Sequence, residues 1–309
     1  MIHTPVSPLS TEGVGFTAYL VAWLRAQSSI PYAKVIADLI GAEEVISRTL
    51  TDEGDRQALL AFAPVLELRH RSITGCIEYQ GSSYDRLHRK APVVSLASGF
   101  SPISLELSVN RGFVDTDLPH MTTARRQVLE KVRNSHKQPH HQKIFVRPAN
   151  VLDIDELWGA THLAFMKQVP DNVIFTAEGL LPYFTHTQKK VFLGNIFEVL
   201  EHTGGMLVLT DILLRERLEQ FMSDERLRHI IELIMGITGA DLIAQCFSSW
   251  AESQEMLYDI GYSVTPISQS YIYPAEKLST IVGEPSEPLL TMLGEQKVCI
   301  LHPRNIMAS

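Results

Sequence analysis

Short apolar runs along the chain alternate with longer segments in which apolar residues recur at helical spacing. The runs predict strands at residues 93–97, 112–116, 143–146, 172–177, 206–210, 262–266 and 297–301. Helical segments lie between the first five of these strands, including 121–135, 157–165 and 188–200. Because strands that alternate with helices form parallel sheets, this order predicts an α/β fold with a doubly wound, mostly parallel seven-stranded sheet. A loop separates the last two strands, which predicts an antiparallel edge.

Two further groups of predicted helices lie outside this alternation. One precedes the first strand, at about 17–26, 32–40 and 57–75, and predicts an N-terminal helical cap over the edge of the sheet where ligands bind. The other occupies 212–245 and predicts a helical lid insertion over the same edge. Within one structural domain we therefore distinguish a cap (1–90), an α/β core (91–211), a lid insertion (212–250) and the end of the core (251–309).

Composition narrows the class of protein. The 309 residues are 45% hydrophobic, which is enough for a large core, and the formal net charge of −8 argues against nucleic acid as a partner. No apolar stretch is nearly as long as the roughly 20 residues that a membrane-spanning helix needs. The three cysteines are odd in number and widely spaced, which is typical of reduced thiols, so we expect a cytoplasmic protein. No pairing of cysteine with cysteine or histidine indicates a metal site, and we expect none.

The clearest candidate site lies in residues 91–119, where the first two predicted strands end. The first strand ends in a turn of small residues, Ala97 to Gly99, which lets the backbone approach a cofactor closely. The second ends in Asp115 and Asp117, and an acidic side chain in this place can accept both hydroxyls of a ribose. The turn holds one glycine instead of G-x-G-x-x-G, which disfavours a dinucleotide. We therefore expect a cofactor with a ribose and an adenine but no phosphate, a description that S-adenosylmethionine fits.

Later strands also end in small or polar residues. Asn150 and Val151 follow the third strand, Glu178 and Gly179 follow the fourth, and Asp211 follows the fifth. Because the carboxyl ends of parallel strands meet at one edge of a sheet, we expect these residues to converge with the first two strand ends.

Four segments carry more specific motifs. They are T-A-x-x-x-A-x-x-R-A at 17–26, the arginine-bearing helix around Arg69, L-A-S-G-F-S-P with V-D-T-D-L-P within 96–119, and T-A-E-G-L-L-P-Y-F at 176–184. With these motifs the sequence resembles the leucine carboxyl methyltransferase-like family of class I S-adenosylmethionine-dependent methyltransferases. The family includes protein phosphatase carboxyl methyltransferases and bacterial natural-product O-methyltransferases. The resemblance covers about residues 15–211, whereas the C-terminal part matches only in its order of helices and strands.

The resemblance implies S-adenosylmethionine as the cofactor and a role for individual residues. The methionine moiety would lie beside Ala97, Ser98 and Gly99, the ribose would bind Asp117, with Asp115 as second choice, and the adenine would lie between Asn150 and Val151. Glu178, followed by Gly179, would lie near the amino group or the sulfonium. Arg25 and Arg69 would bind a carboxylate of the cofactor or of the substrate. Tyr183 would border the acceptor pocket, so Glu178, Tyr183 and Arg69 are the expected catalytic residues.

The sequence departs from the family at three positions. Ile103 stands near the place of an arginine that is common soon after the glycine turn, Thr74 stands where an aspartate is common, and Asn150 also stands where aspartate is frequent. These departures imply that adenosine binding is retained while acceptor recognition is altered.

The resemblance predicts an O-methyltransferase that acts on a carboxylate of a small molecule or natural-product intermediate. A carboxylate is ionised near neutral pH, so this reaction needs positioning and exclusion of water but no general base. A hydroxyl acceptor would need a base, for which His186 or His162 is the candidate. A non-catalytic protein that binds the cofactor or a partner is the other alternative, and the sequence leaves the oligomeric state open.

Overall fold

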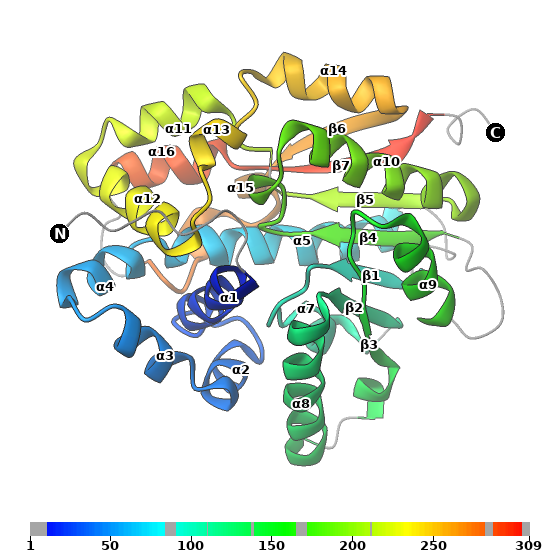
Figure 1. The fold of residues 1–309 in the computed structure, drawn as a ribbon, viewed down its shortest axis with the longest axis horizontal. Helices are drawn as coiled ribbons and strands as arrows, with labels where there is room; N and C mark the ends of the chain where they lie inside the picture. The colour runs from blue at the N-terminus through cyan, green and yellow to red at the C-terminus, as the bar shows by residue number, and fades with distance from the viewer. Residues whose placement is uncertain are drawn as a thin grey trace.

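The structure, a computed structural model, describes residues 11–83, 91–109, 111–136, 139–164, 172–210, 212–281 and 287–304, so Asp211 lies outside the described residues. Its centre is a seven-stranded sheet in the order β3-β2-β1-β4-β5-β7-β6 (Figure 1). The strands are β1 Val93–Leu96, β2 Phe113–Asp117, β3 Ile144–Pro148, β4 Val173–Ala177, β5 Gly205–Leu209, β6 Tyr262–Ser268 and β7 Lys297–Pro303. Strands β1 to β5 pair in parallel, and β7 pairs antiparallel with both β5 and β6. The predicted doubly wound sheet and its antiparallel edge are therefore confirmed.

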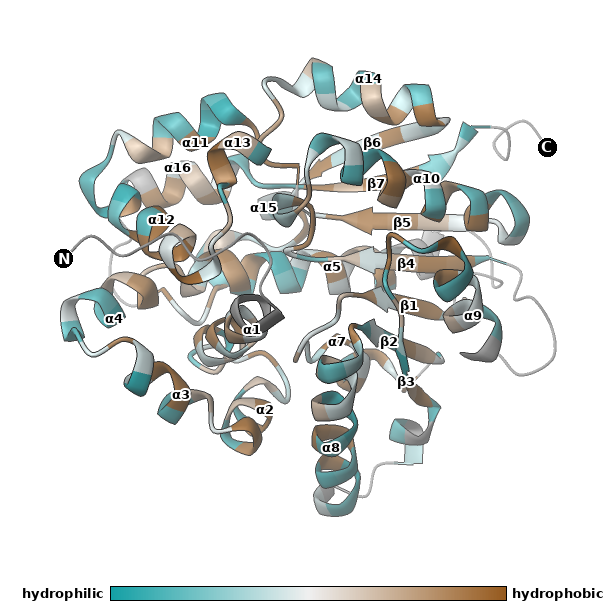
Figure 2. Cartoon of the chain, in the orientation of Figure 1, coloured by the Kyte–Doolittle hydropathy of each residue, from teal (hydrophilic) through white to brown (hydrophobic). Residues whose placement is uncertain are grey.

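The middle of the sheet is buried on both faces, as its unbroken apolar runs predict. All residues of β1, β2 and β4 are buried. One face packs against α9 (Ile154–Ala164), α10 (His186–Thr203) and α14 (Trp250–Ile260), and the other packs against α5 (Ala63–Ser83), α7 (Ile103–Leu107) and α8 (Pro119–His136). Figure 2 shows that β4 and β5 are hydrophobic along much of their length, while the outer helices carry hydrophilic stretches.

Five helices precede β1, where the sequence predicts three. They are α1 (Thr11–Arg25), α2 (Ala33–Ile40), α3 (Ala42–Thr49), α4 (Glu53–Leu60) and α5. The predicted helix at 57–75 is wrong in its bounds, because α4 ends at Leu60 and α5 begins with Ala63 and Pro64, whose missing N–H is tolerated in a first turn. Helices α3 and α4 escape prediction because each is short and buries at most two residues, which leaves no periodic apolar signal.

Between β5 and α14 the chain forms α11 (Arg215–Met222), α12 (Glu225–Thr238) and α13 (Leu242–Gln245), as expected for an insertion after a strand. Helix α12 packs against α1, so segments about 200 residues apart cover the same edge of the sheet (Figure 1). Near the C-terminus, α15 (Gln269–Ile272) and α16 (Glu287–Glu295) lie between β6 and β7, where the sequence predicts only a loop. Within the described ranges, none of the helices combines the length and hydrophobicity that crossing a membrane requires.

Candidate functional site

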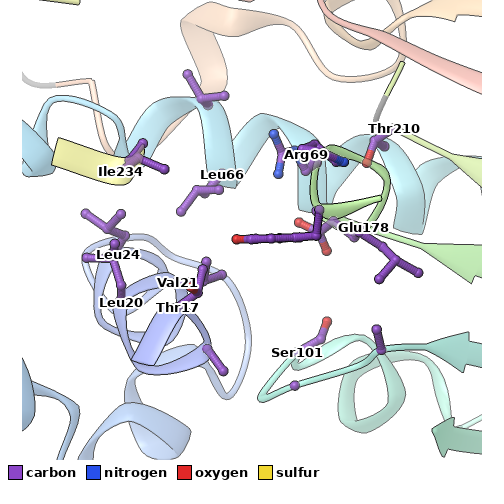
Figure 3. A pocket seen from close by; sticks show the side chains of 18 of the residues that line it. Thr17, Leu20, Val21, Leu24, Leu66, Arg69, Ser101, Glu178, Thr210 and Ile234 are labelled. Carbon is purple, nitrogen blue, oxygen red and sulfur yellow. The ribbon is translucent and has the colours of Figure 1, made fainter. Parts of the chain in front are cut away.

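A cavity of about 300 Å³ lies at the carboxyl ends of β1, β2, β4 and β5. Residues at these strand ends line one part of it, and residues of α1, α5, α11 and α12 line much of the rest (Figure 3). Ligand sites of open α/β sheets occur in this place. The cavity brings together nine of the residues that the sequence predicts for the site: Arg25, Arg69, Ala97, Ser98, Gly99, Asp117, Glu178, Gly179 and Tyr183.

The turn after β1 is hydrogen-bonded to the last residue of β2. The Gly99 N–H donates to Asp117 Oδ2 at 2.7 Å, and the Leu118 N–H donates to Asp117 Oδ1 at 2.8 Å. Gly99 has φ 50° and Ala97 has φ 45°, a left-handed conformation that a residue with a Cβ adopts at a cost. Such strain persists where the surrounding structure fixes it, which is common at ligand sites. The turn lines the cavity in this strained conformation.

The carboxylate of Asp117 is buried beside this turn. Burial raises the pKa of Asp117, and the hydrogen bonds from the Gly99 and Leu118 N–H groups, with the charge of His120, offset only part of this effect. The side chain therefore lines the cavity as an acceptor whose protonation occurs at a higher pH than usual for an aspartate.

Glu178, directly after β4, forms an ion pair with Arg25, the last residue of α1. The two side chains are only 6% (Arg25) and 10% (Glu178) exposed. Burial on its own would raise the pKa of Glu178, but the charges of Arg25, Arg69 and His70 outweigh it and lower the pKa below its usual value. Glu178 therefore stays ionised near neutral pH. Its second oxygen, Oε2, is buried and accepts no hydrogen bond from the described residues.

Arg69, on α5, lines the same cavity close enough to Glu178 for its charge to act on that carboxylate. Its Nη1 lies 3.6 Å from the position that a Cβ on Gly179 would take, and Gly179 has φ 71°. A larger residue at 179 would be strained by this backbone conformation, while its Cβ would lie in ordinary van der Waals contact with the guanidinium. The guanidinium of Arg69 forms no hydrogen bond or close ion pair with a described residue and acts on Glu178 only through its charge, whereas Arg25 is paired with Glu178. It is a cation at the cavity wall with donors available for an anion.

Among the polar lining residues that the sequence did not predict for the site, two have a side-chain oxygen without a partner. Ser101 Oγ and Thr176 Oγ1 are buried at the cavity without a hydrogen-bond partner in the described part of the chain. Both lie inside the motifs quoted above, Ser101 two positions after Gly99 and Thr176 two positions before Glu178. Their place next to these predicted residues is a sequence signal that could have identified them.

The structure places Asp115 away from the cavity, which corrects its assignment as an alternative ribose ligand. Asp115 is 1% exposed, and its Oδ2 accepts hydrogen bonds from Arg125 Nε at 2.9 Å and Ser104 Oγ at 2.7 Å. The side chain thus forms a buried ion pair that joins β2, α7 and α8. It has a structural partner already and does not face a ligand.

Asn150 and Val151 are also outside the cavity wall. The Asn150 side chain is exposed and accepts a hydrogen bond from the Leu152 N–H at 3.1 Å, while Val151 packs in the core beside α9. Of the three departures from the family, Ile103 lies in the wall, but Thr74 donates to carbonyl groups within α5.

Neither histidine proposed as a base for a hydroxyl acceptor lines the cavity. His186 donates from Nε2 to the Cys246 carbonyl at 3.2 Å, and His162 packs edge-on against Trp158. Across the part of the chain that the structure describes, no cluster of three histidine, cysteine, aspartate or glutamate side chains is arranged to hold a metal ion.

No protein-family model matches the sequence, and no curated protein sequence matches it. Solved structures do share the fold. A DUF574 family protein from Streptomyces avermitilis is similar at a TM-score of 0.51 and 12% identity, over 93% of this chain and 97% of that chain. An O-methyltransferase family protein from Burkholderia thailandensis is similar at a TM-score of 0.45 and 13% identity, over 80% of this chain. The S-adenosylmethionine-dependent methyltransferase SibL has a TM-score of 0.41 and 12% identity, over 72% of this chain.

The chain spans 60% of the length of the Burkholderia protein and 52% of the length of SibL. The Streptomyces avermitilis protein, in contrast, matches it over nearly its whole length. The strand order and the antiparallel β7 confirm the predicted doubly wound, Rossmann-like fold.

Proposed function

We propose that the protein is an S-adenosylmethionine-dependent O-methyltransferase of the leucine carboxyl methyltransferase-like family, and that it methylates a carboxylate of a small molecule. The observation that carries this proposal is one cavity that holds a backbone turn, an acidic residue at the end of β2, and the unpaired guanidinium of Arg69. These groups match a nucleoside with an amino acid attached and an anionic acceptor beside it.

The residues present fit the cofactor. Asp117 would accept the ribose hydroxyls, since it lines the cavity beside the turn at Ala97 and Gly99, and each of its oxygens accepts one backbone N–H and can accept a second hydrogen bond. Ser101 Oγ and Thr176 Oγ1, both buried without partners, would bond polar groups of the methionine. Glu178, which stays ionised, would attract the positively charged amino group or sulfonium.

The adenine would extend beyond the cavity towards the loop after β3. The Ala149 N–H donates to the Asp117 carbonyl at 2.9 Å, so this loop begins beside the proposed ribose site. Asn150 and Val151 follow directly, and we keep them as proposed adenine contacts on this account.

Arg69 is the proposed ligand of the acceptor carboxylate. Arg25 forms an ion pair with Glu178. Among the described lining residues, Arg69 is therefore the cation that has no ion-pair partner. A bidentate pair with its guanidinium would hold the carboxylate and orient one oxygen towards the methyl group. Tyr183, at the end of the 3₁₀ turn Leu181–Tyr183, would border the acceptor.

Bound S-adenosylmethionine would supply a methyl group on a sulfonium, so that an acceptor oxygen forms the new C–O bond as the S–C bond breaks and its electron pair stays on sulfur. An ionised carboxylate releases no proton in this exchange and needs no base. The absence of histidine from the described wall of the cavity favours this acceptor over a hydroxyl. The α/β core would consist of residues 91–211 and 251–309. Residues 1–90 would act as the cap and residues 212–250 as the lid, and together they would exclude water from the cavity.

The proposal is tested by incubating the protein with methyl-labelled S-adenosylmethionine and a cell extract. We expect label in the small-molecule fraction, and we expect mild base to release it as methanol, because methyl esters hydrolyse and methyl ethers do not. Label that resists base would contradict a carboxylate acceptor. Label in protein would contradict a small-molecule acceptor.

A further inference from the structure

One part of the cavity, away from the strand ends, is walled by aliphatic side chains. Figure 3 shows Leu20 and Leu24 of α1 and Ile234 of α12 on one side of the cavity, with Arg69 and Glu178 on the other. We call this part the apolar chamber, and it is lined by Leu20, Leu24, Leu66, Ile230, Ile231 and Ile234. The cavity is thus divided into a polar end and an apolar end.

The insertion after β5 contributes to the chamber in a selective way. Helices α11 and α12 carry many charged residues, among them Arg215, Glu216, Arg228 and Glu232. Every described residue that 212–250 contributes to the cavity is nevertheless apolar. The charged faces of these helices point away, so the insertion offers a ligand only apolar contact.

This division restricts what an acceptor can look like. A polar ligand group that lies against an apolar wall loses its hydrogen bonds to water and gains none from the protein. A peptide would bring an amide N–H and a carbonyl for each residue into the chamber, where the named side chains offer neither donors nor acceptors. An aliphatic or aromatic body would instead gain from burial.

We propose that the acceptor is a monocarboxylic acid with an apolar body, its carboxylate bound at Arg69 and its body in the apolar chamber. This inference rests on the proposed function. In the reaction a carboxylate oxygen forms a bond to the methyl carbon, the S–C bond breaks with its electron pair on sulfur, and the products are a neutral methyl ester and a neutral thioether. No proton or further reactant is needed.

The first test measures kcat/KM with labelled S-adenosylmethionine and straight-chain acids of increasing length. Because each buried methylene favours binding, we expect kcat/KM to rise about fourfold for each added methylene until the chamber is filled, and then to fall. Acids of equal length with a hydroxyl or a second carboxylate at the far end should react at least tenfold more slowly. A short peptide that ends in leucine serves as the polar comparison.

The second test changes the size of the chamber. Ile234→Ala should move the best chain length upwards and Ile234→Phe should move it downwards, because the side chain lies at the wall. Leu233, the preceding residue of α12, is half-buried like Ile234 but does not line the cavity, so Leu233→Ala should leave the best chain length unchanged. Comparison of the position of the optimum, rather than the rate, avoids confusion with a loss of folding.

The outcomes separate this inference from the proposed function. Binding of S-adenosylmethionine is measured in parallel by calorimetry without any acceptor. If the protein binds it but transfers methyl to the peptide or to the polar-ended acids as well as to the apolar acids, or to no acid of the series, the inference is overturned. If it binds neither S-adenosylmethionine nor its demethylated product, the proposed function fails. A chain-length optimum that moves with Ile234 and not with Leu233 supports the inference.

Discussion

Arg25 at the end of α1 and Glu178 at the end of β4 form a buried ion pair across 153 positions of sequence. The pair joins the helices that precede the sheet to the strand ends that line the cavity. It also holds a carboxylate in its ionised form at the place where the proposed cofactor carries positive charge. One contact therefore contributes to both the fold and the site.

Removal of one partner of this pair should destabilise the protein strongly. Arg25→Met leaves the buried Glu178 carboxylate without its ion-pair partner, with only the charges of Arg69 and His70 nearby, and we expect the free energy of unfolding to fall by about 3–5 kcal/mol. Urea unfolding followed by circular dichroism measures this. Arg48→Met is the matched control, since Arg48 and its partner Glu44 are 76% and 67% exposed, and it should cost less than about 0.5 kcal/mol. Equal losses in the two variants would show that the Arg25 pair has no special role.

Replacement of the two neighbouring aspartates should separate their roles. Asp117→Ala removes the proposed ribose acceptor, and we expect the affinity for S-adenosylmethionine to fall by about 1–3 kcal/mol, roughly 5- to 150-fold. Asp115→Asn disturbs the buried pair with Arg125 and should lower the stability while the folded protein keeps its affinity. Calorimetric titration at a temperature where both variants are folded gives the comparison. The assignment is refuted by an Asp117→Ala variant that binds as well as the unchanged protein.

Cofactor affinity should depend on pH through Asp117. The ionised carboxylate accepts the ribose hydroxyls, and burial raises its pKa, so the affinity should fall as the pH drops through that raised pKa. In the free protein, the free energy of unfolding depends on pH in the opposite direction from the cofactor affinity. A raised pKa in the folded state contributes stability below the pKa of the unfolded chain, and this contribution is lost as the pH rises through the folded pKa. Titrations over a pH series, with Asp117→Asn as the variant that cannot ionise, measure the dependence. If the affinity changes with pH by the same amount in the unchanged protein and in Asp117→Asn, the pH dependence comes from another group.

Loss of the unpaired guanidinium should affect the acceptor more than the cofactor. With Arg69→Met we expect the KM for the acid to rise roughly 10- to 100-fold, the loss of a charge-assisted bidentate contact. The Kd for S-adenosylmethionine should change little. Arg71→Met is a control on the same helix, because Arg71 bonds Ser29 Oγ and does not line the cavity. If Arg69→Met weakens S-adenosylmethionine instead, the guanidinium binds the methionine carboxylate.

The sheet could be predicted from the sequence because its strands are short apolar runs, such as Val93 to Leu96, that stand out against their surroundings. Helices with little buried surface could not be predicted from the sequence. Ile46 and Ala42 are the only buried residues that α3 contributes among those described, which is too few to form a pattern. Short polar helices depend on their neighbours, and these are known only once the chain is folded.

The site could be predicted down to the strand end but not down to the side chain. Asp115 and Asp117 are two positions apart on one strand and are chemically identical, and the sequence prefers Asp117 only through the resemblance. Their difference comes from Arg125 of α8, which reaches Asp115 and leaves Asp117 to the turn at Gly99. The pairing of Arg25 with Glu178, which leaves Arg69 without a partner, is likewise a contact between distant segments that composition and spacing do not reveal.

The most direct test of the account is calorimetric titration of the purified protein with S-adenosylmethionine and with its demethylated product, S-adenosylhomocysteine. Both ligands should bind at one site per chain, and Asp117→Ala should weaken both. If neither ligand binds while circular dichroism shows that the protein is folded, the cavity at the ends of β1, β2, β4 and β5 is not an S-adenosylmethionine site and the account is contradicted.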